Sequence, residues 1–173
     1  MDFDTVFDRV VGHEGGYSDN PKDPGNWTGG KCGVGELKGT KYGLAANTYQ
    51  SLDIKNITES QARAIYYEDW WQALGMDRFS LAMKFQMFDA AFNHGMYNAS
   101  KIYQRAVGTK DDGIIGPKTL SAASKLSEND RLLRFLAFRL KFYTSLRKFD
   151  EFGRGWSNRV ADNLLHASND NED

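Results

Sequence analysis

The sequence has 173 residues, 40% of them hydrophobic, and a net charge of −1, which suits one globular domain or a domain with a short appendage. Aromatic residues reach 13%, enough for a hydrophobic core, so a wholly disordered chain is excluded. No apolar run approaches the roughly 18 residues of a membrane span. The single cysteine, Cys32, excludes an internal disulfide framework.

Helical periodicity runs through most of the chain, so the expected fold class is mainly α. Apolar residues recur at helical spacing in residues 2–13, and Thr58 with Gln61 forms a capping box ahead of a second helix, ARAIYYEDWW. No convincing strand pair or internal repeat is visible. Further helices are predicted after Ser80 up to Gly95, after Asn98 up to Gly108, from Pro117 to about Leu126, and over residues 129–148 and 156–167.

The second half of the chain is basic, with 13 basic and 6 acidic residues between Asn98 and Val160. This balance indicates attraction to an anionic polymer or membrane surface, or simply solvated helix faces. The helix predicted at 129–148 carries a broad apolar arc, so we expect it to be first a core element. Its exposed side is expected to be a narrow cationic stripe: Arg134, Lys141 and Lys148.

Glycine and proline gather in one segment: ten of the 17 glycines and two of the three prolines lie between Gly12 and Gly43. Structureless loops longer than about 12–15 residues tend to be functional or disordered. This segment also contains several aromatic and acidic side chains, a composition that is unusual for a linker. We therefore expect the chemistry of the protein to lie in this loop.

Glu14 is the strongest catalytic candidate, in the run HEGGY at the end of the first predicted helix. The helix dipole is negative at that end, which raises the pKa of a carboxyl group and favours its protonated form. A carboxylic acid that stays protonated near neutral pH is what cleavage of a glycosidic bond needs. A surface glutamate beside a glycine cap is the alternative, and the residues alone leave both open.

The rest of the loop favours a carbohydrate site. Asp19, Asp23 and Glu36 supply a possible second carboxylate, and glycosidases generally work with a pair. Flat aromatic and amide or hydroxyl side chains, suited to stacking on and hydrogen bonding with sugars, accompany them: Tyr17, Trp27, Tyr42, Asn20, Asn26 and Thr28.

Other kinds of site are less well supported by the sequence. The run GNWTGGK matches most of a phosphate-binding loop, but Cys32 follows where a serine or threonine should hold magnesium. The cysteine could act as a nucleophile only with a base such as His13 or His94 close in space. No histidine or cysteine pair has metal-ligand spacing, so no metal and no cofactor are predicted.

Several runs of the sequence together resemble glycoside hydrolase family 108. They are HEGGYSDNPKDPG, KYGLAANTY, QARAIYYEDWW and FDAAFNHG, and the later DGIIGPKTL resembles the peptidoglycan-binding segment that accompanies this family. The resemblance covers most of Val11 to about Leu120. Members of the family are N-acetylmuramidases of the lysozyme-like superfamily, many of them phage endolysins. The resemblance therefore implies a lysozyme-like, single compact helical unit with a long glycine-rich active-site loop.

The resemblance also implies a division of the chain and a set of site residues. Residues 1–95 would form the catalytic region, and residues 96–173 a helical peptidoglycan-binding region packed on it. Glu14 matches the family's catalytic acid. Asp23 falls in the family's motif region and is the expected second carboxylate, with Glu36 as the alternative because this chain inserts NWTGGKCGVGELKG after DPG. The expected substrate-binding residues are Tyr17, Thr40, Tyr42 and Asn93.

The implied function is cleavage of the β-1,4 bond between N-acetylmuramic acid and N-acetylglucosamine, which lyses the bacterial cell wall. Bacterial peptidoglycan is then the partner, and we expect a monomer without nucleic-acid binding or stable membrane insertion. The acidic start MDFDTVFDRV does not look like a signal peptide, so we expect synthesis in the host cytoplasm and release to the periplasm by a holin or a secretion machine. Alternatives are a lytic transglycosylase and a non-catalytic wall-binding or secretion-associated protein.

Overall fold

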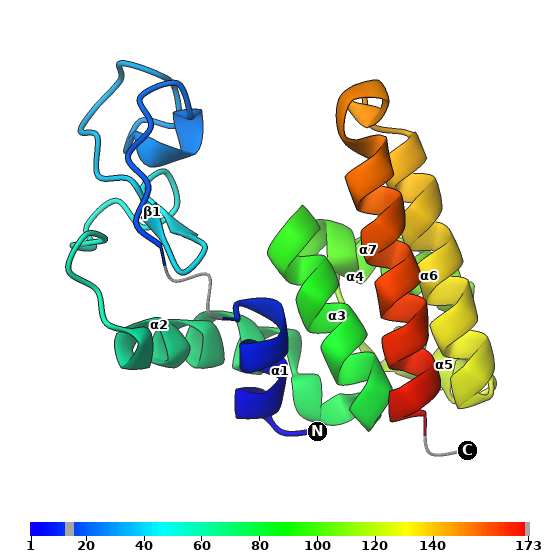
Figure 1. The fold of residues 1–173 in the computed structure, drawn as a ribbon. Coiled ribbons are helices and arrows are strands. Elements are labelled where there is room, and N and C mark those ends of the chain that lie inside the picture. Colours follow the sequence, from blue (N-terminus) through cyan, green and yellow to red (C-terminus); the bar gives the residue numbers. More distant parts are fainter. Residues whose placement is uncertain (13–15, 172–173) are drawn as a thin grey trace. The chain divides into compact units, whose positions relative to one another are not determined.

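The computed structural model describes residues 1–12 and 16–171, and most of them are helical (Figure 1). The mainly α, lysozyme-like fold class is thereby confirmed. The chain divides into two compact units, one of Phe3–Gln72 and one that combines Met1–Asp2 with Ala73–Asp173. The helices are α1 (Phe3–Val10), α2 (Glu59–Tyr66), α3 (Leu81–His94), α4 (Met96–Val107), α5 (Pro117–Ala123), α6 (Glu128–Thr144) and α7 (Phe149–Asp170).

In the N-terminal unit, α1 packs against α2 through aromatic and ionic contacts. The Phe7 and Tyr66 rings lie 5.7 Å apart, edge to face, and both side chains are fully buried. Arg63 covers the Phe7 ring and forms ion pairs with Asp4 and Asp8. The apolar face predicted for the first helix is therefore the face that makes the core of this unit.

The helix predicted after Thr58 begins where the sequence predicts, but its α-helical part ends earlier than predicted, at Tyr66. The Thr58 hydroxyl accepts from the Gln61 amide, and the Gln61 side chain accepts from the Thr58 amide, so the capping box is confirmed. After Tyr66 the chain continues as a π-helix, η2 (Tyr67–Gln72). Phe3 packs edge-on against Trp71 at this point, with ring centroids 5.4 Å apart.

A short antiparallel strand pair, β1 (Thr40–Lys41) and β2 (Leu44–Ala45), lies in the glycine-rich loop. The sequence did not predict a strand pair, because two residues are too few to show the alternation that marks a strand. The turn between them places Tyr42 and Gly43 at positive φ, 51° and 76°. Positive φ at both central residues is typical of tight hairpin turns.

The C-terminal unit is a helix bundle in which α4 contacts α3, α5 and α6, and α7 contacts α3 and α6. α3 is its most buried helix, with nine buried residues between Ala82 and Ala91. Gly95 takes a positive φ of 78° and joins α3 directly to α4, so α4 begins at Met96 and not after Asn98. Within the described ranges, no helix has both the length and the apolar character needed to cross a membrane.

The last two helices differ from their predicted bounds. α6 ends at Thr144, and α7 begins at Phe149, upstream of the predicted start at residue 156. Glycines are poor helix formers, and α7 contains Gly153 and Gly155 in its first turns. Packing of α7 on α3 and α6 overrides this local preference. Gly153 makes room for the Phe149 ring one turn earlier, because a β-carbon there would come within 2.9 Å of the ring. Of the predicted cationic stripe, Arg134 and Lys141 are exposed on α6, whereas Lys148 is the residue before α7.

Candidate functional site

The glycine-rich loop is organised around Asn26, whose side chain is only 1% exposed. Its amide nitrogen donates to the Asn20 carbonyl at 3.0 Å, and its amide oxygen accepts from the Thr40 hydroxyl at 2.7 Å. Its backbone carbonyl accepts from the amides of Lys38 and Gly39, both at 3.0 Å. The sequence suggested Asn26 as a sugar contact, but the structure shows it satisfied and buried inside the loop.

Asp23 begins the short 3-10 helix η1 (Pro24–Asn26) and caps it. One of its carboxylate oxygens accepts from the Gly25 amide at 2.9 Å, while the side chain stays exposed. An aspartate before Pro-Gly commonly forms such a turn. Asp23 therefore has a structural role here, and an exposed carboxylate in a fixed position is also what a catalytic partner requires.

Residues 26–39, interpreted from the sequence as an insertion, form a hairpin-like excursion. Trp27 bridges to Leu37, and the Thr28 amide donates to the Glu36 carbonyl at 3.0 Å. The Thr28 hydroxyl in turn accepts from the Glu36 amide at 2.9 Å. The Glu36 carboxylate is exposed and lies 3.4 Å from the Lys38 ammonium, so it is held at the surface of this hairpin.

Tyr17 lines a hollow of about 310 Å³ in the N-terminal unit. Lys38, Asp53 and Lys55 line the same hollow, together with apolar side chains of the segment 51–54. Desolvation, and then the nearby Asp19 and Asp53 carboxylates, raise the pKa of the Tyr17 phenol, which keeps it neutral. A neutral phenol beside apolar and charged groups can hydrogen-bond a sugar hydroxyl and pack on its ring.

Thr40 lies on strand β1 of the β1–β2 hairpin, and Tyr42 lies in the turn of that hairpin. The amide of Thr40 donates to the Ser18 carbonyl at 2.8 Å and its carbonyl accepts from the Ser18 amide at 2.9 Å, which ties the chain at Ser18 to the hairpin. The carbonyl of Tyr42 accepts from the Tyr66 hydroxyl at 3.0 Å, although Tyr42 is a non-glycine residue at positive φ. Such conformations persist only where the surroundings hold them, and they gather at functional sites.

Two predicted site residues do not belong to the described part of the N-terminal unit. Glu14, the predicted catalytic acid, lies outside the described residues, and its role stays a prediction. Asn93 belongs to the C-terminal unit, where it is exposed near the end of α3. Its amide nitrogen donates to the Asp89 carbonyl at 2.7 Å.

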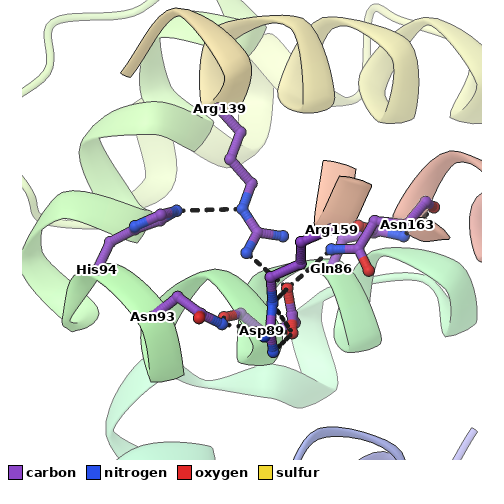
Figure 2. Close-up of polar contacts among 7 residues, drawn as sticks. All are labelled: Gln86, Asp89, Asn93, His94, Arg139, Arg159 and Asn163. Atoms are coloured by element: carbon purple, nitrogen blue, oxygen red, sulfur yellow. Dashed lines mark hydrogen bonds and ion pairs between the residues drawn. The ribbon is translucent and has the colours of Figure 1, made fainter. Parts of the chain in front are cut away.

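A buried charge cluster around Asp89 was not predicted from the sequence (Figure 2). Asp89 on α3 pairs with Arg139 on α6 and Arg159 on α7, each with a nitrogen 2.6 Å from a carboxylate oxygen. Asn163 donates to the same carboxylate at 2.7 Å. Asp89 and Arg139 are almost completely buried, so one carboxylate joins three helices. The only sequence signal was a single acid within the apolar run KFQMFDAAF.

The cluster fixes the charge states of its members. Burial acts to raise the pKa of Asp89, but Arg139 and the hydrogen bonds from Arg159 and Asn163 outweigh it and hold that pKa below its ordinary value. Burial and the neighbouring Arg139 lower the pKa of His94 to about 3, so its imidazole is neutral. Its Nε2 can therefore accept from the Arg139 Nε–H, which lies 3.1 Å away. Asn93 therefore lies on a helix, α3, that ion pairs from Asp89 connect to α6 and α7.

Among the described residues, no group of three or more histidine, cysteine, aspartate or glutamate side chains lies close enough together to hold a metal ion. Cys32 is exposed and not part of a disulfide.

Comparison with known proteins identifies both parts of the chain. The model of the glycosyl hydrolase 108 family matches residues 7–95, and that of a predicted peptidoglycan domain matches residues 98–161. The chain is also similar to the structure of Brucella abortus SagA, with 30% identity and a TM-score of 0.82. That similarity covers 99% of this chain and 96% of the Brucella chain. No curated protein matches the sequence. The resemblance read from the sequence motifs is thereby confirmed.

Proposed function

The chain belongs to the glycosyl hydrolase 108 family, and from this we infer that it is an endolysin-type N-acetylmuramidase. Its broader activity, hydrolysis of glycosidic bonds in peptidoglycan, follows from the family and from the peptidoglycan domain beside it. The bond cleaved in this proposal is the β-1,4 linkage between N-acetylmuramic acid and N-acetylglucosamine. The observation that carries it is the family match over residues 7–95, which contains every predicted site residue.

In the proposed mechanism, Glu14 donates a proton to the leaving glycosidic oxygen. Asp23 then stabilises the oxocarbenium-like transition state or activates the attacking water. The exposed position of Asp23 as the cap of η1 supports this role, and the hollow beside Tyr17 supports binding of a sugar close to the loop. The side chains of Thr40, Tyr42 and Asn93 complete the proposed substrate contacts. Neither a metal nor a cofactor enters this scheme.

We place this activity at the bacterial cell wall. Peptidoglycan is the partner, the protein acts as a monomer, and lysis follows from loss of glycan continuity. Synthesis in the host cytoplasm followed by release through a holin or a secretion machine would bring the protein to its substrate in the periplasm.

Digestion of purified Gram-negative peptidoglycan tests the proposed bond. A muramidase should lower the turbidity of the suspension and release fragments with reducing N-acetylmuramic acid ends, which mass spectrometry identifies. Fragments with 1,6-anhydro ends would show a lytic transglycosylase instead. Turbidity that stays constant with pure protein, together with co-sedimentation of the protein with the sacculi, would mean that the chain binds the wall without cleaving it.

The second carboxylate is tested by comparing Asp23→Asn with Glu36→Gln. If Asp23 is the catalytic partner, Asp23→Asn should lower kcat at least about tenfold with an unchanged melting temperature, since an asparagine oxygen can still cap η1. Glu36→Gln should remain close to the parent, because its carboxylate is held by Lys38 on the hairpin surface. A large loss in Glu36→Gln with normal kcat in Asp23→Asn would exchange the two assignments.

A further inference from the structure

A hollow of about 640 Å³ lies in the C-terminal unit, between the end of α4 and the start of α5. We refer to it as the Lys110–Lys118 hollow, after the two lysines in its lining. The apolar side chains of Ile114 and Pro117 line it, and Asp112 adds one acid. It lies within residues 98–161, the segment matched by the predicted peptidoglycan domain.

The wall of this hollow is preformed, because the buried Gln104 side chain holds the loop above it. The Gln104 amide nitrogen donates to the Asp112 carboxylate at 2.8 Å and to the Ile114 carbonyl at 3.0 Å. The Gln104 amide oxygen accepts from the Gly113 amide at 2.8 Å. A preformed, mostly apolar hollow with a few fixed polar groups is the usual form of a small-ligand site, since binding then costs little ordering.

The side chains of the hollow define the chemistry of a ligand. Ile114 is 72% exposed, although an isoleucine gains from burial. Lys110 and Lys118 are exposed, and the charge of Lys110 acts on the nearby Asp112. The hydrogen bond from Gln104 and that from the Ile114 amide lower the pKa of Asp112, so it is a fixed negative charge. A ligand that satisfies this set has small apolar groups, carboxylates and an amino group.

Sugar rings are a poorer match, because no aromatic side chain lines the hollow and sugars are usually held by flat aromatic faces. The peptide stems of peptidoglycan are a better match, since they combine alanine methyl groups with free carboxylates and, in diamino-acid stems, an amino group. The two exposed lysines complement the acidic groups of such a stem. Asp112 complements the amino group.

We propose that the Lys110–Lys118 hollow binds the peptide stem of peptidoglycan, with the stem carboxylates at the two lysines and alanine methyl groups against Ile114 and Pro117. This inference deepens the proposed function and rests on the chain acting on peptidoglycan. It assigns recognition of the peptide to the C-terminal unit, while cleavage of the glycan is assigned to the loop of the N-terminal unit.

Binding is measured with the full chain carrying Glu14→Gln, which prevents digestion during the assay. Co-sedimentation compares intact sacculi with the same sacculi after an amidase has removed the stems, and a soluble stem tripeptide serves as competitor. Removal of the stems should weaken binding at least about tenfold, and the tripeptide should displace the protein from intact sacculi. Both effects should shrink at high salt, because exposed charges are screened.

Matched variants locate the site. Lys110→Glu with Lys118→Glu should weaken binding to intact sacculi about tenfold or more, whereas Lys125→Glu with Arg154→Glu, the same charge change at exposed positions elsewhere, should not. Ile114→Glu should weaken binding, and Leu165→Glu, at a residue 66% exposed on α7, should leave it unchanged. Melting temperatures close to that of the parent show that each variant is folded.

Equal binding to intact and stem-free sacculi, or unchanged binding of the folded double lysine variant at low salt, would overturn the proposal. Release of reducing ends by the chain with its native Glu14 is measured separately. Stem binding without glycan cleavage would refute the proposed hydrolase alone, and cleavage without stem binding would refute the role of the hollow alone.

Discussion

Replacing Glu14 with glutamine should lower the rate of peptidoglycan hydrolysis by about 10²–10⁴-fold or more, since general acid catalysis usually contributes a factor in this range. Glutamine keeps the shape and hydrogen-bonding capacity of the side chain but cannot donate the proton. The melting temperature should therefore stay close to that of the parent. The measurement is the initial rate at which reducing ends are released from purified sacculi.

Glu68→Gln is a matched control for this variant, because Glu68 is exposed on η2 and has no assigned role. Its rate should equal that of the parent. If Glu14→Gln keeps a rate within tenfold of the parent, Glu14 is not the general acid. A lower rate together with a lower melting temperature would instead show that Glu14 supports the fold.

Replacing Asp89 with asparagine should destabilise the C-terminal unit by about 3–5 kcal/mol, the range seen when one partner of a buried ion pair is removed. Arg139, at 0% exposure, and Arg159 would then face each other without a counter-charge. Denaturant unfolding measures the change. Because the native pKa of Asp89 is lowered, its contribution is present at neutral pH and is lost as the pH falls through that native value.

Asp77→Asn is the control, because the Asp77 side chain is 92% exposed and its carboxylate lies as far as 4.0 Å from the Lys84 ammonium. It should change the free energy of unfolding by less than about 1 kcal/mol. If Asp89→Asn does not fold, Asn163→Ala gives a milder test, since it removes one buried donor and should cost about 1–3 kcal/mol. Parent-like stability of both Asp89→Asn and Asn163→Ala would contradict a stabilising role for the cluster.

Local signals predicted the fold well where they act over one helical turn. The Thr58–Gln61 capping box and Pro117 at the start of α5 are found where the sequence placed them. The start of α7 was missed because its two glycines argue locally against a helix, and only packing by distant residues overrides them. The hairpin at Tyr42 was missed because a turn with positive φ at tyrosine has no reliable sequence signature.

The candidate site was predictable in its location but not in its internal arrangement. Glycine content, acids and aromatics identified the loop, and the motif around Glu14 identified the family. The structural role of Asn26 could not be read from the sequence, because its partners Asn20 and Thr40 are 6 and 14 residues away. The Asp89 cluster depends on residues still further along the chain, so the lone acid in an apolar helix was the only indication.

The contacts of Asp89 also determine how the molecule can be shortened. They join α3 to residues 70 and 74 positions further along, in the last helix. A fragment that stops at residue 95, where the match to the hydrolase family ends, would keep α3 but lose α4, α6 and α7. The apolar face of α3 would then be open to water, and its carboxylate would have neither arginine. The end of the family match is therefore not a position at which this protein can be truncated. During synthesis, α3 can bury its apolar face and pair Asp89 completely only after the last helix has been made.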